Sequence, residues 1–262
     1  MWFEQSIVRR LLSNLTRSPA GCAFTLAQAA EAEAAGEALV FERLESHAPD
    51  KLKPLIRRHY ADERAHAELL REAVRGCGAP CPVLSPELNI VHVLDRQLGG
   101  PLLSGAIRSD DAAIRVYVIV ELLERRAVRE MGLLADALAA HGRPEATTLL
   151  RIRADEARHI RYCRAALRLY GRPLAEPGDP PSALEREVCA EVREALDQYD
   201  VSTVTYLLDT GLLTFGAGPI ERSAWRALLA GLRAKVALRT RGQFLYPTSH
   251  EPLAAAVGPL AG

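Results

Sequence analysis

The sequence has little of what marks membrane proteins, nucleic-acid-binding proteins and β-rich proteins. It contains no run of about 18 apolar residues without a charge, so we expect no transmembrane span. Lys plus Arg and Asp plus Glu number 33 each, and this balance does not predict a nucleic-acid partner. Aromatic residues make up only 5% of the chain, and runs of β-branched residues are few, which argues against a fold built from strands.

The five cysteines form neither a CxxC pair nor the spacing of a zinc ribbon. The N-terminus lacks the compact apolar core and the cleavage site of a signal peptide. Together with the odd number of cysteines, this N-terminus predicts a reducing, cytoplasmic location. Cys77 and Cys81, in "CGAPC", are near enough in sequence for a disulfide within a loop, but free thiols near a helix end are the favoured interpretation.

Ala, Leu, Arg and Glu are abundant, and this composition predicts an all-α protein. Segments rich in Gly and Pro divide the 262 residues into helical stretches. The expected units are an N-terminal amphipathic helix over 1–20, a bundle of four helices over 21–172, a linker over 173–183, a C-terminal helical extension over 184–246 and a flexible tail over 247–262.

The predicted bundle consists of two helical hairpins. Helices of about 22–46 and 51–75 are joined by the tight turn "HAPD", and helices of about 111–140 and 144–170 are joined by "HGRP". A longer crossing connects the two hairpins, which is the connectivity of a four-helix bundle with one long crossover. Beyond the linker, the pattern predicts three more helices, at about 183–199, 200–215 and 219–240.

One short phrase occurs twice, as "ADERAHA" at 61–67 and as "ADEARHI" at 154–160, on the second helix of each hairpin. Residues i and i+3 of a helix share a face, so Glu63 lies beside His66, and Glu156 lies beside His159. A carboxylate and an imidazole on one face are ligands for a first-row metal such as iron or manganese. Two such pairs on facing helices predict two metal ions side by side, completed by one Glu from each of the other two helices.

The first helix of each hairpin offers inward carboxylates for this site. Glu33 lies at the centre of an apolar helix face, about level with Glu63, where an unpaired carboxylate would be costly; it is therefore a predicted ligand. On the helix of about 111–140, Glu121 and Glu124 both face inward. Glu124 is more nearly level with Glu156 across the "HGRP" turn, which favours it as the ligand. Glu121 is the more deeply embedded in apolar sequence, and both are candidate ligands.

An aspartate precedes the glutamate of each motif. A metal-bound His needs an acceptor for its other ring nitrogen, and we expect Asp62 and Asp155 each to hold the His of the other motif across the bundle. The alternative is that both aspartates are ordinary surface charges. His59 is expected to lie off the metal face, either beside the ligands or in solvent.

These residues resemble the ferritin-like di-iron carboxylate superfamily over about residues 22–170. "DEARH" at 155–159 resembles the Asp-Glu-x-Arg-His motif of the hydroxylase subunits of bacterial multicomponent monooxygenases, and "DERAH" at 62–66 matches it less fully. The two inward glutamates on one helix resemble those of rubrerythrins. The chain departs from these relatives, because it lacks the cysteine spacing of a rubredoxin-like domain, its C-terminal helices have no ferritin counterpart, and Ile152 stands where arylamine N-oxygenases have a His.

The resemblance implies a ferritin-like bundle that holds two Fe ions, or one Mn and one Fe, with dioxygen as co-substrate. The first hypothesis is a non-haem di-iron oxygenase or oxidase that acts on a small organic substrate. Its electrons would come from an external donor such as a ferredoxin or a reductase, because no flavin or nicotinamide motif occurs. The alternatives are a ferroxidase or peroxide scavenger like ferritins and rubrerythrins, and a scaffold with a vestigial metal site. The apolar stretch 205–225 is consistent with a pocket wall or with a subunit interface, which would allow a homodimer.

Overall fold

The computed structural model describes residues 2–100, 107–175 and 181–240, and every regular element within these ranges is a helix. The expectation of an all-helical chain is confirmed for this part of the protein. The predicted tail 247–262, the last residues of the predicted extension and 176–180 of the predicted linker lie outside the described residues. The elements are α1 (Trp2–Leu15), α2 (Pro19–His47), α3 (Lys53–Gly76), η1 (Pro86–Leu88), α4 (Ile90–Gln97), α5 (Asp110–Ala140), α6 (Glu145–Leu169), α7 (Ala183–Asp209) and α8 (Pro219–Thr240).

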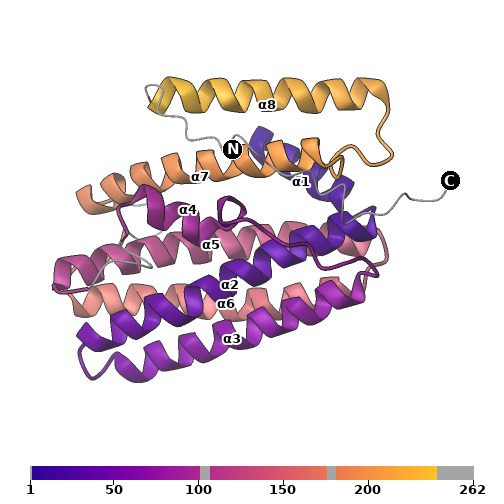
Figure 1. Ribbon diagram of the computed structural model, residues 1–262. Helices are drawn as coiled ribbons and strands as arrows, with labels where there is room; N and C mark the ends of the chain where they lie inside the picture. Colours follow the sequence, from indigo (N-terminus) through magenta and orange to yellow (C-terminus); the bar gives the residue numbers. More distant parts are fainter. Residues whose placement is uncertain (1, 101–106, 176–180, 241–262) are drawn as a thin grey trace.

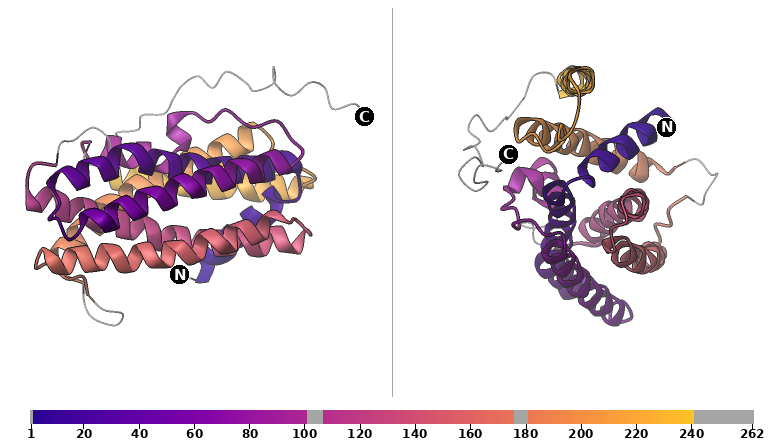
Figure 2. Two further views of the ribbon diagram at one scale, coloured as in Figure 1. Left: turned by 90° about the horizontal axis from the view of Figure 1, so that it is seen from below. Right: turned by 90° about the vertical axis from the view of Figure 1, so that its right-hand side faces the viewer.

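Four long helices form two hairpins that pack side by side. Helix α2 packs along α3, and α5 packs along α6, in the two most extensive helix pairings of the molecule (Figure 1). The hairpins meet where α3 contacts α6 and where α2 contacts α5. Helices α7 and α8 lie on one side of these four, with α8 outermost, as both Figure 1 and the right-hand view of Figure 2 show.

The ends of the long helices are set by local residues. Ser18 caps α2 by accepting a hydrogen bond from the Gly21 backbone N–H, and Pro19 follows in the first turn. Ser109 caps α5 in the same way, and two aspartates in its first turn favour the positive end of the helix dipole. Gly142, with φ of 65°, makes the tight turn from α5 to α6. These signals set where α2 and α5 begin and where the chain turns from α5 into α6.

The prediction of two separate helices at 183–199 and 200–215 is wrong. A single helix, α7, runs from Ala183 to Asp209 because no Gly or Pro interrupts this stretch, and a capping box of Ser182 and Glu185 begins it. Within α7, Asp200 accepts a hydrogen bond of 2.8 Å from Arg126, which ties α7 to α5.

The core of the two hairpins consists of two apolar clusters with a polar layer between them. One cluster surrounds the turn between α2 and α3 and includes Leu44, Ile56 and Tyr117. The other lies toward the opposite end and includes Leu26 and Leu134. On each of the four helices, the residues between these clusters include buried Glu or His side chains. The fold thus places ionisable groups in a layer that apolar side chains close off above and below.

None of the helices in the described part of the chain combines the length and the apolar character needed to cross a membrane. This agrees with the sequence-based expectation of no transmembrane span.

Candidate metal centre

Seven buried side chains gather in the polar layer, and each of them is at most 8% exposed. They form two groups that share Glu63, and within each group one nitrogen or oxygen per residue lies within 4.8 Å of the others. The members are Glu33, Glu63, His66 and Glu156 in one group and His59, Glu63, Glu124 and His159 in the other.

The two Glu-x-x-His motifs meet at the centre of this layer. The Nδ1 atom of His66 lies 2.9 Å from Oε1 of Glu156, and Nδ1 of His159 lies 2.8 Å from Oε2 of the same carboxylate. Glu156 therefore spans both imidazoles. The Oε1 atom of Glu63 lies 3.1 Å from Nδ1 of His159, so the carboxylate of each motif approaches the imidazole of the other.

One glutamate from each of the remaining two helices closes the layer. Oε2 of Glu33, on α2, lies 3.5 Å from Nδ1 of His66. Oε2 of Glu124, on α5, lies 3.8 Å from Nδ1 of His159. Each group therefore contains the histidine of one motif and a glutamate from the other helix of the same hairpin. These are His66 with Glu33, and His159 with Glu124.

The aspartates of the two motifs hold the outer nitrogens of the imidazoles. Nε2 of His66 lies 3.3 Å from Asp155, and Nε2 of His159 lies 3.3 Å from Asp62, so each His contacts the Asp of the other motif. Arg158 donates hydrogen bonds to both aspartates, at 2.7 Å and 2.9 Å. In a neutral imidazole, an Nε2–H that donates to a carboxylate leaves the lone pair on Nδ1, the nitrogen that faces the polar layer.

Burial and crowding raise the pKa values of several of these groups. Burial, together with the charges of Glu63 and Glu156, holds the pKa of Glu33 well above its usual range. Burial and the neighbouring Glu156 raise the pKa of Glu124 to about 7. Burial opposes the protonation of His159, but hydrogen bonds to Glu124, Glu156 and Glu63 prevail and raise the pKa of this imidazole to about 12. Without a metal, protons therefore balance the negative charge of the layer.

Two carboxylates have lowered pKa values instead. Burial alone would raise the pKa of Glu63, but the close contacts of its Oε1 with His159 and His59, at 3.1 Å each, outweigh it and hold this pKa well below its usual range. Burial likewise opposes ionisation of Glu156, while hydrogen bonds with Glu124 and with the histidines lower its pKa to about 2. The central carboxylates are thus ionised and available as ligands at neutral pH.

The chemistry of the donor set fits two divalent metal ions. Several buried atoms in the layer make no hydrogen bond, although most of them lie within ion-pair distance of a neighbour; they are Oε2 of Glu33, Nδ1 of His59, Oε1 of Glu63, Nδ1 of His66 and Oε1 of Glu156. Buried oxygen and nitrogen atoms that lie close together without a hydrogen bond have lone pairs that a metal ion could accept. The four carboxylates of the two groups would offset the charge of two divalent ions.

The structure separates the two candidate glutamates of α5. Glu124 belongs to one of the two groups, whereas Glu121 does not. Glu121 is fully buried, but its oxygens accept hydrogen bonds of 2.9 Å from Arg164 and 2.8 Å from Arg125. The two positively charged guanidinium groups thus offset the negative charge of this buried carboxylate, so it needs no metal ion to do so.

His59 was expected off the metal face, either beside the ligands or in solvent; the structure buries it within one of the two groups, so it is not solvated and does not lie off that face. The side chain is 2% exposed, and its Nε2 lies 3.0 Å from Glu124 and 3.1 Å from Glu63. Its ring stacks on that of His159, with centroids 3.8 Å apart. The signal was present in the sequence, because His59 precedes Glu63 by four residues and His66 by seven, and both spacings keep a residue on one helix face.

Comparison of the chain with known protein families, with curated proteins and with solved structures finds no match. Its class is therefore defined by its own architecture. The protein is an all-helical chain of packed helices with a buried cluster of His and Glu side chains that is compatible with a di-iron site.

Proposed function

We propose that the protein is a ferritin-like di-iron protein that activates dioxygen. The observation that carries this proposal is the convergence of Glu and His side chains from four helices on one buried layer, where several of their inward atoms make no hydrogen bond. Such a donor set suits iron or manganese, so the alternative pair is one Mn and one Fe.

The contacts suggest a division of the ligands between two ions. Glu33 and His66 would hold one ion, and Glu124 and His159 would hold the other. Glu63 and Glu156 would be available to either ion, because Glu63 belongs to both groups and Glu156 approaches both imidazoles. When bound, the two irons supply the redox capacity to reduce dioxygen.

The remaining polar residues orient these ligands. Asp155 and Asp62 hold the outer Nε2–H of His66 and His159, so that Nδ1 of each would be free to bind an ion. Burial alone would raise the pKa of Asp62, but the hydrogen bond from Arg158 lowers it, which keeps this acceptor ionised. Both contacts join α3 to α6, so they form only when these two helices keep their positions relative to one another.

His59 is assigned a different role from the two motif histidines. Its Nδ1 has no hydrogen-bond acceptor, whereas a ligating His has its second nitrogen held. Its Nε2 lies between Glu63 and Glu124, and hydrogen bonds to these carboxylates raise its pKa although burial opposes this. In the proposal, His59 holds a proton at Nε2. This nitrogen lies next to Glu124, whose pKa is about 7.

The proposed reaction class is the oxidation or oxygenation of a small organic substrate, with electrons from an external donor such as a ferredoxin or a reductase. The aromatic side chains beside the polar layer support this class, because Phe41 and Tyr162 pack against His59 and form an apolar boundary at the cluster. An apolar boundary excludes water from the reacting atoms.

The experiment that tests this proposal is reconstitution with ferrous iron, followed by metal analysis and by oxygen-uptake measurements with a reductant. Glu63→Ala should abolish binding of both ions, because Glu63 contributes to both groups. Glu68→Ala is the matched control, since Glu68 lies on the exposed side of the same helix. Equal iron content in both variants would refute the assignment.

A further inference from the structure

A second cluster of reactive groups lies in the apolar region away from the turn between α2 and α3. It consists of Cys22 in the first turns of α2, Cys77 directly after α3 and Glu145 in the first turn of α6. All three side chains are buried, with exposures of 0%, 3% and 6%. One atom of each lies within 4.8 Å of the others. None of them belongs to the candidate metal centre.

The two sulfur atoms are in direct contact. The Cys77 thiol donates a hydrogen bond to Cys22 Sγ, and the two sulfurs are 3.0 Å apart. This separation is about 1 Å longer than a covalent S–S bond of about 2.05 Å. Oε2 of Glu145, beside the pair, makes no hydrogen bond. Because the sulfurs are only 3.0 Å apart, small movements at the start of α2 and the end of α3 would bring them to bonding distance.

The two thiols differ in acidity, as a nucleophile and its partner must. The hydrogen bond from Cys77 lowers the pKa of Cys22, and Arg143 acts in the same direction, although burial and Glu145 oppose it. The same hydrogen bond, together with burial, raises the pKa of Cys77. The Glu145 carboxylate disfavours a second negative charge on the pair. Cys22 is thus the more acidic of the two thiols, and Cys77 is the thiol that donates to it.

We propose that Cys22 and Cys77 form a redox-active pair, which a small peroxide oxidises to a disulfide that links α2 to the end of α3. Cys22, as the thiolate, attacks one peroxide oxygen and becomes a sulfenic acid; the O–O bond breaks, and the hydroxide that leaves takes up the proton released from Cys22 to form water. The sulfur of Cys77 then attacks the sulfur of Cys22, the S–S bond forms, and the hydroxyl leaves as water with the Cys77 proton. In total, two thiols and one hydrogen peroxide give one disulfide and two waters.

The contact geometry favours a disulfide over a metal ion at this site. Two thiolates that bind one zinc ion at about 2.3 Å each in a tetrahedral arrangement lie well beyond 3 Å from one another. The observed contact of 3.0 Å leaves no space for an ion between the sulfurs. A thiol pair is therefore the simpler interpretation of the cluster.

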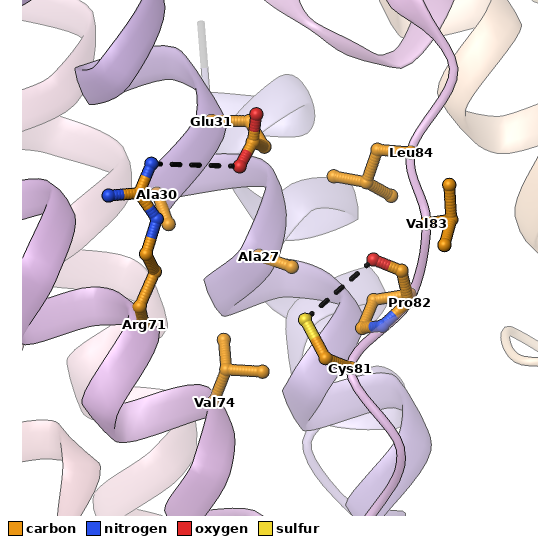
Figure 3. A pocket seen from close by; sticks show the side chains of 9 residues that line it. All are labelled: Ala27, Ala30, Glu31, Arg71, Val74, Cys81, Pro82, Val83 and Leu84. Carbon is orange, nitrogen blue, oxygen red and sulfur yellow. Dashed lines mark hydrogen bonds and ion pairs between the residues drawn. The ribbon is translucent and has the colours of Figure 1, made fainter.

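Cys81 provides an internal control for the proposal. It is exposed, and it lines a surface pocket formed by α2, α3 and the segment that follows α3 (Figure 3). Its Sγ lies 3.9 Å from the carbonyl oxygen of Pro82, and the Cys77 thiol is directed to Cys22 instead. An exposed thiol that lacks a sulfur partner should oxidise without forming this bond.

The proposed bond would close the α2–α3 hairpin at its open end. Cys22 and Cys77 are 55 positions apart, and the chain between them carries Glu33, Glu63 and His66. A disulfide at this point would oppose separation of the two helices and stabilise the fold, because it reduces the freedom of the unfolded chain.

The test begins with fully reduced full-length protein exposed to hydrogen peroxide. The reaction is stopped with acid, the protein is unfolded, and free thiols are alkylated before peptide mass analysis without a reducing agent. We expect a peptide pair joined through Cys22 and Cys77, with a mass lower by two hydrogens, in the wild-type protein and in Cys81→Ser. Free thiols at Cys22 and Cys77 after Cys81 has been oxidised, or a bond between Cys77 and Cys81, would overturn the proposal.

A second measurement does not depend on cysteine variants at the pair. Cys81→Ser is equilibrated in glutathione redox buffers, and its midpoint of denaturant unfolding is followed. We expect one two-electron transition, with a higher denaturation midpoint for the oxidised form. An unchanged midpoint across the redox range, or stoichiometric zinc that is lost when the thiols are alkylated, would contradict a dithiol pair.

Discussion

Nε2 of His66, on α3, lies 3.3 Å from Oδ2 of Asp155, on α6, and the same contact is repeated between His159 and Asp62. Each repeat of the motif therefore supplies the residue that orients the imidazole of the other repeat. The arrangement explains why both copies contain an Asp before the Glu. It also means that damage to one motif should affect both halves of the cluster.

The first prediction concerns these crossed contacts. Asp155→Ala should weaken metal binding by about 10-fold to 100-fold, because His66 loses the acceptor that fixes its ring. Asp155→Asn keeps an acceptor oxygen and should have a smaller effect. Affinity is measured by competition with a chelator, and Asp136→Asn serves as a control because Asp136 is exposed on α5. Affinities equal to that of the wild-type protein in both Asp155 variants would show that the contact has no orienting role.

The second prediction distinguishes the two inward glutamates of α5. Glu124→Ala should alter the optical spectrum of the iron-loaded protein, because Glu124 lies in one of the two donor groups. Glu121→Ala should leave that spectrum similar and lower the free energy of unfolding by about 1–3 kcal/mol, since it leaves Arg164 and Arg125 without their buried partner. The reverse pattern of spectral and stability changes would exchange the roles of these residues.

The third prediction tests the assignment of His59. His59→Gln should still bind two irons per chain. Nδ1 of His59 makes no hydrogen bond, whereas the second ring nitrogen of a metal-binding His is usually held by an acceptor. His66→Gln should lose iron under the same conditions. The stoichiometry is measured by metal analysis after gel filtration. Loss of one iron in His59→Gln would make His59 a ligand.

The fourth prediction follows from the raised pKa of Glu124. In the folded, metal-free protein this carboxyl keeps its proton up to about pH 7, whereas its usual pKa is 4.5, so the unfolded chain loses the proton earlier. Stability of the metal-free protein should therefore fall as the pH rises from about 5 to about 8. Metal ions replace the protons, so bound metal should reduce this loss. The measurement is the denaturation midpoint against pH with and without metal, and a rise over this range in the metal-free protein would contradict the account.

Helical periodicity explains how much of the cluster the sequence could predict. The spacing of Glu63 and His66, and the place of Glu33 within an apolar face, depend only on helix geometry, which local sequence determines. The boundaries of the four long helices follow from Pro, Ser and Gly near their ends in the same way.

Other features depend on tertiary contacts that periodicity does not contain. Glu121 and Glu124 both lie within the inward arc of α5, and what separates them is the pairing of Glu121 with arginines of α5 and α6. The contact between Cys22 and Cys77 joins residues that are distant in sequence, and no local pattern indicates it. The continuity of α7, by contrast, follows from the local sequence, because no Gly or Pro occurs between Ala183 and Asp209.

The central claim is that the polar layer holds two metal ions that react with dioxygen. The most direct measurement is the metal content per chain after expression with added iron, with an optical spectrum recorded after reduction and again after exposure to air. The account predicts about two irons per chain and an absorption band of oxidised di-iron that returns in air. A protein that is folded and metal-free under these conditions would contradict it and would make the repeated motif a remnant within a helical scaffold.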